Sequence, residues 1–228
     1  ALRGYADQGY DLILAENTGY QDANLRVAKD YPKLHFATVP GYITRAQGAK
    51  NSPANHAAYD WPAHQAAYLG GIIAGRMTKT GKIGFLSAQP VPDIARQYVG
   101  FKAGIEATNP NAKLFKILTG SWIDSAKAKE GAKALLELGC DVIMQAASAP
   151  GVAALKTIAE SGKLVIGYEL DQNPLAPKHV LTSIMLNKGL AYEVMLKAVS
   201  NGTFESREYL FDMLQGGVEL APYHGNVP

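Results

Sequence analysis

Cysteine is almost absent from the sequence, since Cys140 stands alone among 228 residues. A single cysteine cannot close a disulfide within the chain, and its place at the start of an apolar run predicts a buried structural thiol. Long apolar runs are also missing, because charged residues or glycines interrupt each one well before the roughly 18 residues that a membrane span needs. No charged segment followed by an apolar one opens the sequence, so we expect a soluble chain that, if exported, has already been processed.

Charge of one sign is equally scarce. The sequence has 22 Lys and Arg against 20 Asp and Glu, a formal net charge of +2, and no run of like charges. This balance argues against a nucleic-acid surface or an anionic-membrane patch. With 47% hydrophobic and 18% charged residues, the composition also excludes a disordered, collagenous or coiled-coil chain. The length allows one large domain or two small ones.

Motifs for catalysis and cofactor binding are missing as well. The sequence has no GxSxG elbow, no GxxxxGK[ST] phosphate loop and no GxGxxG between a strand and a helix. Its five histidines, His35, His56, His64, His179 and His224, share no metal-ligand spacing. We therefore expect neither hydrolase chemistry nor a cofactor or metal site.

Short apolar runs alternate with segments of helical period along the whole chain, which predicts an α/β fold with parallel strands. The predicted strands cover residues 11–17, 35–39, 82–87, 113–118, 141–146, 164–169 and 180–186. The segment 40–59 contains glycine, serine and proline, so it predicts a loop and a candidate domain boundary.

Helix starts are marked by residues that cap helices well. The predicted starts are Asp60 with Pro62, Asp93, Asp124 or Ser125, Ser148 with Pro150, and Asn187. The helix from Asp124 should stop at Gly139, and the helix from Asn187 near Gly202. The helix over 61–77 is rich in alanine and glycine, which predicts close packing against a sheet.

Polar and aromatic residues follow five of the predicted strands, at the end where open α/β sheets bind ligands. These residues are Glu16, Asn17, Thr18 and Tyr20; Ser121, Trp122 and Asp124; Ser148; Glu169, Asp171 and Gln172; and Asn187 and Lys188. So many strand ends with ligand-binding chemistry predict a ligand crevice.

Three of these residues have chemistry suited to a planar, hydroxylated ligand. Trp122 could stack on a flat ring or simply cover the adjacent helix. Glu169 could accept hydrogen bonds in a desolvated cleft or be an ordinary loop acid. Lys188 lies at a helix N-terminus, where the dipole disfavours a cation, so it could have a carboxylate or ligand hydroxyl as its partner or be an ordinary surface lysine. Asp124 fits a helix cap better than a ligand contact.

Several segments together are similar to one known family. They are GYDLI at 9–13, NHAAYDWPAHQAAYLGG at 55–71, GRMTKTGKIGF at 75–85, GSWID at 120–124, GYELDQ at 167–172 and LTSIMLNK at 181–188. In this order the chain resembles, over nearly its entire length, the basic membrane protein family. These are purine nucleoside receptor-like substrate-binding proteins of ABC importers.

The resemblance implies a type I periplasmic-binding-protein fold, in which two α/β lobes are joined by three hinge strands and a ligand is held in the interlobe cleft. The crossings would fall near Tyr59, Leu186 and Phe204. One lobe would comprise residues 1–59 plus 187–204, and the other residues 60–186 plus 205–228. Family members begin with a further strand and an acidic, Asn-containing loop and end with a further strand, so we expect a protein longer than this chain at both ends.

The resemblance also implies roles for particular residues. Trp122 matches the family's stacking aromatic, Glu169 its ribose-binding acid and Lys188 its hydroxyl-binding lysine. The family has Asp where this chain has Glu169, and the extra methylene would shift or shrink the space for a sugar. A free base such as adenine therefore competes with a nucleoside as the expected ligand.

With this resemblance, the sequence predicts a solute-binding, non-enzymatic component of an ABC importer. It would bind a purine-type ligand through Trp122, Glu169, Lys188 and Asn17, with Tyr20, Ser148 and Asp171 beside them. The implied partners are ABC permease subunits, and the implied location is periplasmic or extracytoplasmic, with a lipid anchor at the N-terminal side. Three alternatives stay open: a flavin-like ligand, a ligand-sensing domain of the same fold, and a nucleoside-processing enzyme with Glu169 as base.

Overall fold

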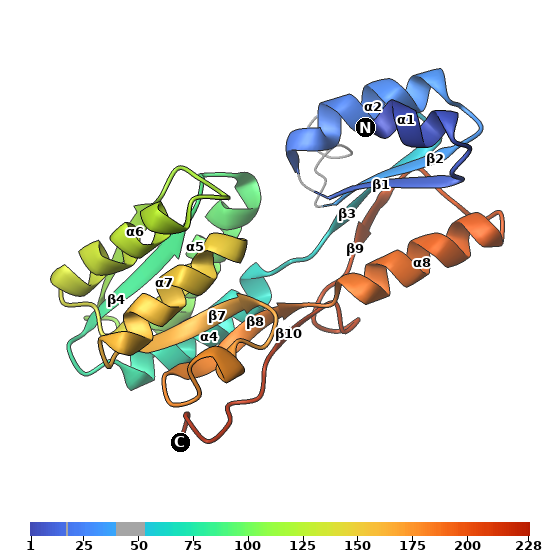
Figure 1. Ribbon diagram of the computed structural model, residues 1–228. Helices are drawn as coiled ribbons and strands as arrows, with labels where there is room; N and C mark the ends of the chain where they lie inside the picture. The colour runs from blue at the N-terminus through green and yellow to red at the C-terminus, as the bar shows by residue number, and fades with distance from the viewer. Residues whose placement is uncertain (17, 40–52) are drawn as a thin grey trace. The chain divides into compact units, whose positions relative to one another are not determined.

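The computed structural model describes residues 1–16, 18–39 and 53–228. The chain divides into two compact units. Unit 1 comprises Ala1–Pro62 and Asn187–Gly217, and unit 2 comprises Ala63–Leu186 and Val218–Pro228. Each unit has its own sheet (Figure 1).

Unit 1 is a parallel sheet with the strand order β1-β2-β3-β9. Its elements are α1 (Leu2–Asp7), β1 (Leu12–Glu16), the 3₁₀ turn η1 (Thr18–Tyr20), α2 (Gln21–Asp30), β2 (His35–Val39), β3 (His56–Asp60), α8 (Lys188–Ser200) and β9 (Glu208–Leu210). Helices α1 and α2 pack on the sheet (Figure 1), and between them Ile13, Val27 and Phe36 form a buried cluster.

Aromatic rings join β3 to β9 in unit 1. The ring of Tyr59 stacks on Tyr209 at 4.9 Å between centroids and on Phe211 at 5.8 Å. The Arg207 guanidinium lies 3.8 Å from the centre of the Tyr209 ring, a cation–π contact. Burial raises the pKa of Tyr59 above its usual value. This stack secures a pairing between strands about 150 residues apart in the sequence.

Unit 2 is a six-stranded sheet with the order β10-β8-β7-β6-β4-β5, parallel except for the antiparallel β10. Its elements are α4 (His64–Met77), β4 (Lys82–Ser87), α5 (Pro92–Thr108), β5 (Lys113–Leu118), α6 (Ser125–Glu137), β6 (Val142–Ala146), α7 (Ser148–Glu160), β7 (Leu164–Glu169), the 3₁₀ turn η3 (Asn173–Leu175), β8 (Val180–Leu186) and β10 (Val218–Leu220). Successive residues of a strand face opposite sides. Accordingly Leu86 belongs to the cluster beneath α6 and α7, whereas Phe85 contacts Phe101 of α5.

The small residues of α4 permit close packing, as the sequence predicts, although a helix is the main neighbour. A Cβ on Gly71 would lie 2.1 Å from the Phe101 carbonyl oxygen, and one on Gly104 of α5 would lie 2.0 Å from the Tyr68 carbonyl oxygen. Gly70, in contrast, faces Ile166 of the sheet. Helices α4 and α5 thus approach each other backbone to backbone.

The α/β class and all seven predicted strands are confirmed. Five have the predicted bounds, and the other two, β1 and β6, each begin one residue later than predicted. The predicted last residue of β1, Asn17, lies outside the described residues. Among the described residues, three further strands were not predicted: β3, β9 and β10. Residues 40–52 of the predicted loop lie outside the described residues, but the prediction is wrong for 56–59, because that segment pairs with β2 and β9.

Helix ends follow the predictions in part. The Asp124 carboxylate accepts from the Ala126 and Lys127 N–H groups at 2.9 and 3.1 Å, and the Asn187 side chain caps α8. The predicted cap at Asp93 is wrong, because α5 begins at Pro92 and Val91 occupies the N-cap position. The predicted start at Asp60 is also wrong. Asp60 ends β3, where its carbonyl accepts from the Phe211 N–H, and α4 begins at His64.

Residues 205–217 lie in unit 1, whereas the sequence placed them with the other lobe. The reason is the parallel pairing of β9 with β3, which keeps this segment in unit 1 until Val218. Cys140 is fully buried as expected, and burial raises the pKa of its thiol to about 11. None of the described helices combines the length and apolar character needed to cross a membrane.

Candidate functional site

The carboxyl ends of two neighbouring strands of unit 2 bring Ser148 and Glu169 together. Glu169 is the last residue of β7, and Ser148 follows β6 and opens α7. The Ser148 hydroxyl donates to the Glu169 carboxylate at 2.8 Å. Both residues have positive φ, 51° for Ser148 and 72° for Glu169, a region in which side chains other than glycine are uncommon. The sequence predicted both as ligand residues but not their contact.

Trp122 is presented by a short turn after β5. Gly120 has a positive φ of 77°, and its carbonyl accepts from the Gln89 side chain at 3.3 Å. The Ser121 hydroxyl oxygen then accepts from the Asp124 N–H at 3.1 Å, which closes the turn directly before α6. Trp122 is partly buried, while the next residue, Ile123, is 90% exposed. The backbone that carries the indole is thus part of a hydrogen-bonded turn, and the side chain is partly accessible to solvent.

Asp171 makes contacts within its own unit. Its carboxylate accepts from the Asn173 N–H at 3.0 Å and lies 2.8 Å from Nε2 of His224. The same terminal segment is held by Asn226, whose side-chain amide donates to the Pro177 carbonyl at 2.7 Å. These contacts tie Asp171 to the last residues of the chain, a partner that no sequence pattern indicated.

Unit 1 has its own polar group at the end of β1. Glu16, the last residue of that strand, forms an ion pair with Lys188, the first residue of α8. The Tyr192 hydroxyl donates to the other Glu16 oxygen at 3.0 Å, and burial and the Glu16 charge raise the pKa of Tyr192. Lys188 therefore has the carboxylate neighbour that its position at a helix N-terminus called for. Tyr192, one turn along α8, was missed.

Two other residues of unit 1 were predicted as ligand residues, Tyr20 and Asn17. Tyr20 ends η1 and is 56% exposed. Asn17 lies outside the described residues. Within the described ranges, no three His, Cys, Asp or Glu side chains gather as a metal ion would require.

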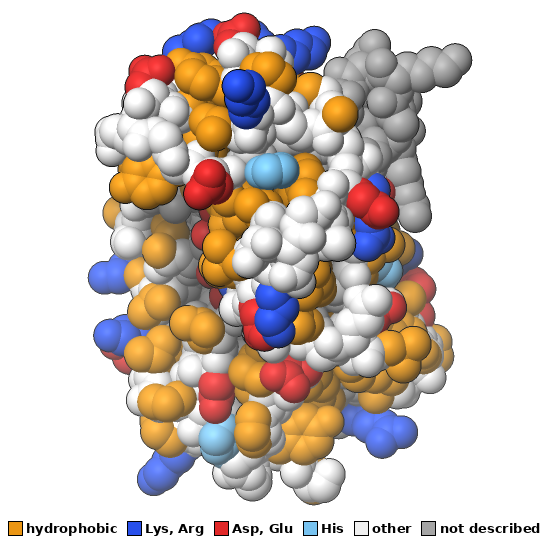
Figure 2. Space-filling model, turned by 90° about the vertical axis from the view of Figure 1, so that its right-hand side faces the viewer, with side chains coloured by type: hydrophobic (Ala, Val, Ile, Leu, Met, Phe, Trp, Pro, Cys, Tyr) orange, Lys and Arg blue, Asp and Glu red, His pale blue; other side chains and the backbone are white. Residues whose placement is uncertain are grey.

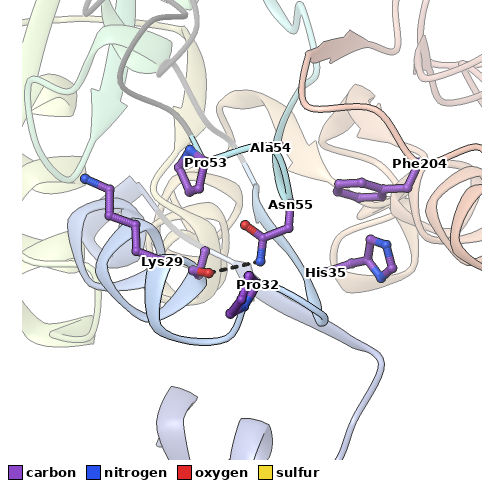
Figure 3. A pocket seen from close by; sticks show the side chains of 8 residues that line it. Lys29, Pro32, His35, Pro53, Ala54, Asn55 and Phe204 are labelled. Atoms are coloured by element: carbon purple, nitrogen blue, oxygen red, sulfur yellow. Dashed lines mark hydrogen bonds between the residues drawn. The ribbon is translucent and has the colours of Figure 1, made fainter.

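A hollow of about 430 Å³ lies in unit 1, away from these strand ends. Figure 3 shows the rings of His35 and Phe204 on one side of it and Pro32 and Pro53 on others. The Asn55 amide nitrogen donates to the carbonyls of Ala28, Tyr31 and Leu34 at 2.7 to 3.0 Å. These hydrogen bonds connect the segments of chain that line the hollow. Because His35 and His56 begin β2 and β3, the hollow lies at the amino ends of the strands, opposite the end where such sheets bind ligands.

Charged side chains do not form a patch of one sign on the face that Figure 2 shows. There, Lys, Arg, Asp and Glu side chains are interspersed among hydrophobic and uncharged ones. This distribution agrees with the near-neutral composition and not with the basic stripe of a nucleic-acid-binding surface.

Comparison with known proteins gives a family match and several relatives. The profile of the family described as ABC transporter substrate-binding protein, PnrA-like, matches residues 1–226. A purine-binding protein of Brucella abortus is 30% identical over 98% of this chain and 61% of its own length. A putative ABC transporter glucose-binding protein of Haloferax volcanii is 30% identical over 94% and 51%. The ABC transporter nucleoside-binding protein BmpA of Lactococcus lactis is 28% identical over 93% and 64%.

The chain thus spans about half to two thirds of the length of these curated relatives. Among solved structures, a solute-binding protein of an ABC transporter from Aeropyrum pernix has a TM-score of 0.86 at 22% identity, over 96% of this chain and 62% of that one. A transcriptional activator of the comK gene from Bacillus halodurans has a TM-score of 0.83 at 26% identity, over 99% and 76%. The predicted fold is confirmed as that of the type I periplasmic binding proteins.

Proposed function

The chain belongs to the family of PnrA-like ABC transporter substrate-binding proteins, and from that premise we propose that its protein captures a purine-type ligand for an ABC importer. The ligand is a free base such as adenine or a nucleoside. The observation that carries this proposal is the 30% identity to a purine-binding protein over 98% of the chain. The nucleoside-binding relative supports the same ligand class.

The site chemistry supports a planar ligand with hydrogen-bonding edges. Trp122 offers a ring that reaches solvent, on which a purine can stack. Glu169 offers a carboxylate that accepts from ring N–H or ribose O–H groups. In unit 1, Lys188 offers a donor at the end of β1, where Asn17 and Tyr20 also lie in the sequence. The proposed roles are stacking by Trp122 and hydrogen bonding by the polar residues.

In this proposal the protein binds its ligand outside the cytoplasm, leaves it chemically unchanged and delivers it to permease subunits. In this proposal Glu169, which accepts from the Ser148 hydroxyl at 2.8 Å, is a hydrogen-bonding group for the ligand. A lipid anchor on the N-terminal side of this chain is part of the proposal. Incubation with adenosine and chromatography of the products should show no free adenine.

Titration calorimetry of the full-length protein with adenine, adenosine, inosine, guanosine, riboflavin and glucose tests the ligand class. We expect heat from at least one purine and none from glucose. Binding of adenine but not of adenosine supports the reduced space for a sugar beside Glu169. Binding of glucose alone would overturn the purine assignment and favour the ligand named for the Haloferax volcanii relative.

A ligand-sensing role is the second candidate, because a transcriptional activator has the same fold at 26% identity over 99% of this chain. Such a protein would bind its ligand and signal to a partner other than a permease. Deletion of the gene separates the two roles. Loss of labelled purine uptake supports transport, whereas unchanged uptake with an altered transcriptional response to purines supports sensing.

A further inference from the structure

Ser148 and Glu169 both keep a polar side chain where the backbone favours glycine. Their φ angles of 51° and 72° lie in the left-handed region, which is costly for residues with a Cβ. Neither is a glycine, although glycine would remove that cost. The side chains also meet, through the 2.8 Å hydrogen bond from hydroxyl to carboxylate. Such an arrangement persists only where the surrounding structure enforces it.

A buried pair of amides enforces it here. Gln145 and Gln172 are 0% and 8% exposed, and the Gln145 amide nitrogen donates to the Gln172 side-chain oxygen at 2.7 Å. The Gln145 oxygen accepts from the N–H of Ala147 at 3.2 Å, and the Gln172 oxygen accepts from the N–H of Tyr168 at 3.3 Å. Each amide therefore holds the residue directly before one of the two strained positions.

Two glycines make room for this amide pair. A Cβ on Gly151 would lie 1.7 Å from the Gln145 side-chain oxygen, and one on Gly167 would lie 2.7 Å from the Gln172 oxygen. The Ser183 hydroxyl completes the group by accepting from the Gln172 N–H at 3.0 Å.

We propose that Ser148 is a positioning residue, which fixes the Glu169 carboxylate for the ligand and does not itself contact the ligand. The buried Gln145–Gln172 pair holds the backbone that makes this contact possible. A glutamate side chain has three rotatable torsions, and fixing them before binding removes an entropic cost from association. The inference rests on the proposed function, because it takes Glu169 to be a ligand group.

Four substitutions at one position separate the hydroxyl from the backbone. Ser148→Ala removes the donor, and Ser148→Gly removes it while relieving the left-handed strain. Ser148→Asn and Ser148→Asp introduce side chains of nearly the same size and shape as each other, and both residue types tolerate positive φ. Asn supplies an N–H donor, whereas Asp places a second carboxylate beside Glu169. Affinity for the purine that binds best to the wild-type protein is measured by calorimetry, and the melting temperature is measured without ligand.

We expect Ala and Gly to weaken binding up to about tenfold, because the Glu169 side chain must then be immobilised when the ligand binds. Ser148→Gly should melt at or above the wild-type temperature, so its weaker binding cannot come from a damaged fold. Ser148→Asn should bind more tightly than Ser148→Asp by at least tenfold. Equal affinities for Asn and Asp, or wild-type affinity for Gly, would overturn the inference.

Crystal structures of the wild-type protein and of the Gly and Asn variants test the positioning without any ligand. The Glu169 side chain should keep its conformation with Asn and adopt another with Gly. An unchanged Glu169 conformation in the Gly variant overturns the positioning role, even if no purine binds. Failure of every purine to bind the wild-type protein, with Glu169 displaced in the Gly variant, instead overturns the proposed ligand and leaves the positioning role supported.

Discussion

At the scale of single residues, a buried histidine gives unit 1 a pH dependence. His56 is 1% exposed, and its Nε2 lies 3.0 Å from the Thr38 hydroxyl, which the Asn24 amide also contacts at 3.1 Å. Burial lowers the pKa of His56 to about 4. Between pH 6.5 and pH 4 the unfolded chain binds a proton at this histidine that the folded chain does not, so stability falls as the pH falls.

The loss due to His56 should reach about 3 kcal/mol at pH 4. Urea unfolding of the wild-type protein and of His56→Gln, measured from pH 7 to pH 4, checks this value. The variant should be less stable at pH 7, because the Thr38 contact changes, but its free energy of unfolding should fall less steeply with pH. Identical slopes in the two proteins would show that His56 is not the titrating group.

Trp122 provides the second prediction at this scale. Replacing Trp122 by Ala should weaken purine binding tenfold or more, because stacking on one base contributes about 1 to 3 kcal/mol. Trp122→Phe, which keeps a flat ring, should retain most of the affinity. Calorimetry measures both, and unfolding by heat should change little because the indole is only partly buried. If the Ala variant binds like the wild-type protein, Trp122 is not the stacking residue.

At the scale of elements, the sequence was informative where a strand is long and apolar. The strands 82–87 and 164–169 combine consecutive apolar residues with clear breaks at both ends, and their bounds were predicted to the residue. The strand β3, HAAYD, contains two alanines and two polar residues and follows a loop-like segment, so its β signal is weak. The strands β9 and β10 have three residues each and depend on partners remote in the sequence.

The candidate site divides in the same way. The apolar pattern predicted where the strands end. It therefore identified Ser148, Glu169 and Lys188 as candidate ligand residues. Their partners depend on geometry that no local pattern encodes. The Ser148–Glu169 contact joins two residues that both have positive φ angles, and the Lys188–Glu16 pair joins residues 172 positions apart. Asp171 was grouped with the ligand residues by sequence, yet its contact with His224 comes from the path of the last residues.

The α4–α5 contact allows a prediction for a whole element. Gly104→Ala would place a Cβ 2.0 Å from the Tyr68 carbonyl oxygen, where only backbone could move aside. We expect a loss of about 3 kcal/mol or more, at the upper end for overpacked sites. Gly4→Ala in α1 meets open space and should stabilise by about 0.5 to 1 kcal/mol. Thermal unfolding measures both, and equal melting temperatures for the two variants would contradict the close helix contact.

At the scale of the whole molecule, unit 2 consists of two chain segments, Ala63–Leu186 and Val218–Pro228, which are separated in the sequence by a segment of unit 1. Residues 187–217 belong to unit 1, while the segments on either side of them, β8 and β10, are antiparallel neighbours in unit 2. Leu186 pairs with Val218, and the Asn187 N–H donates to the Gly217 carbonyl at 2.9 Å. The two chain connections between unit 2 and residues 187–217 therefore lie next to each other, at the paired ends of β8 and β10. Unit 2 also has its own buried cluster around Leu135, Ile143 and Leu155.

Unit 2 should therefore fold without unit 1. A shortened chain that begins at Ala63 and replaces residues 188–216 by Asn-Gly closes the hydrogen-bonded Asn187–Gly217 pair with a two-residue turn of the type that hairpins favour. We expect a single cooperative unfolding transition in urea and dispersed amide resonances. The matched control replaces the same residues by Pro-Pro, which cannot form that turn because its φ angles are fixed near −65°. It should lower the unfolding midpoint, because β10 loses its register on β8. If the Asn-Gly chain instead unfolds without cooperativity, the core of unit 2 depends on unit 1 for its stability, and the two units are one folding domain despite their separate sheets.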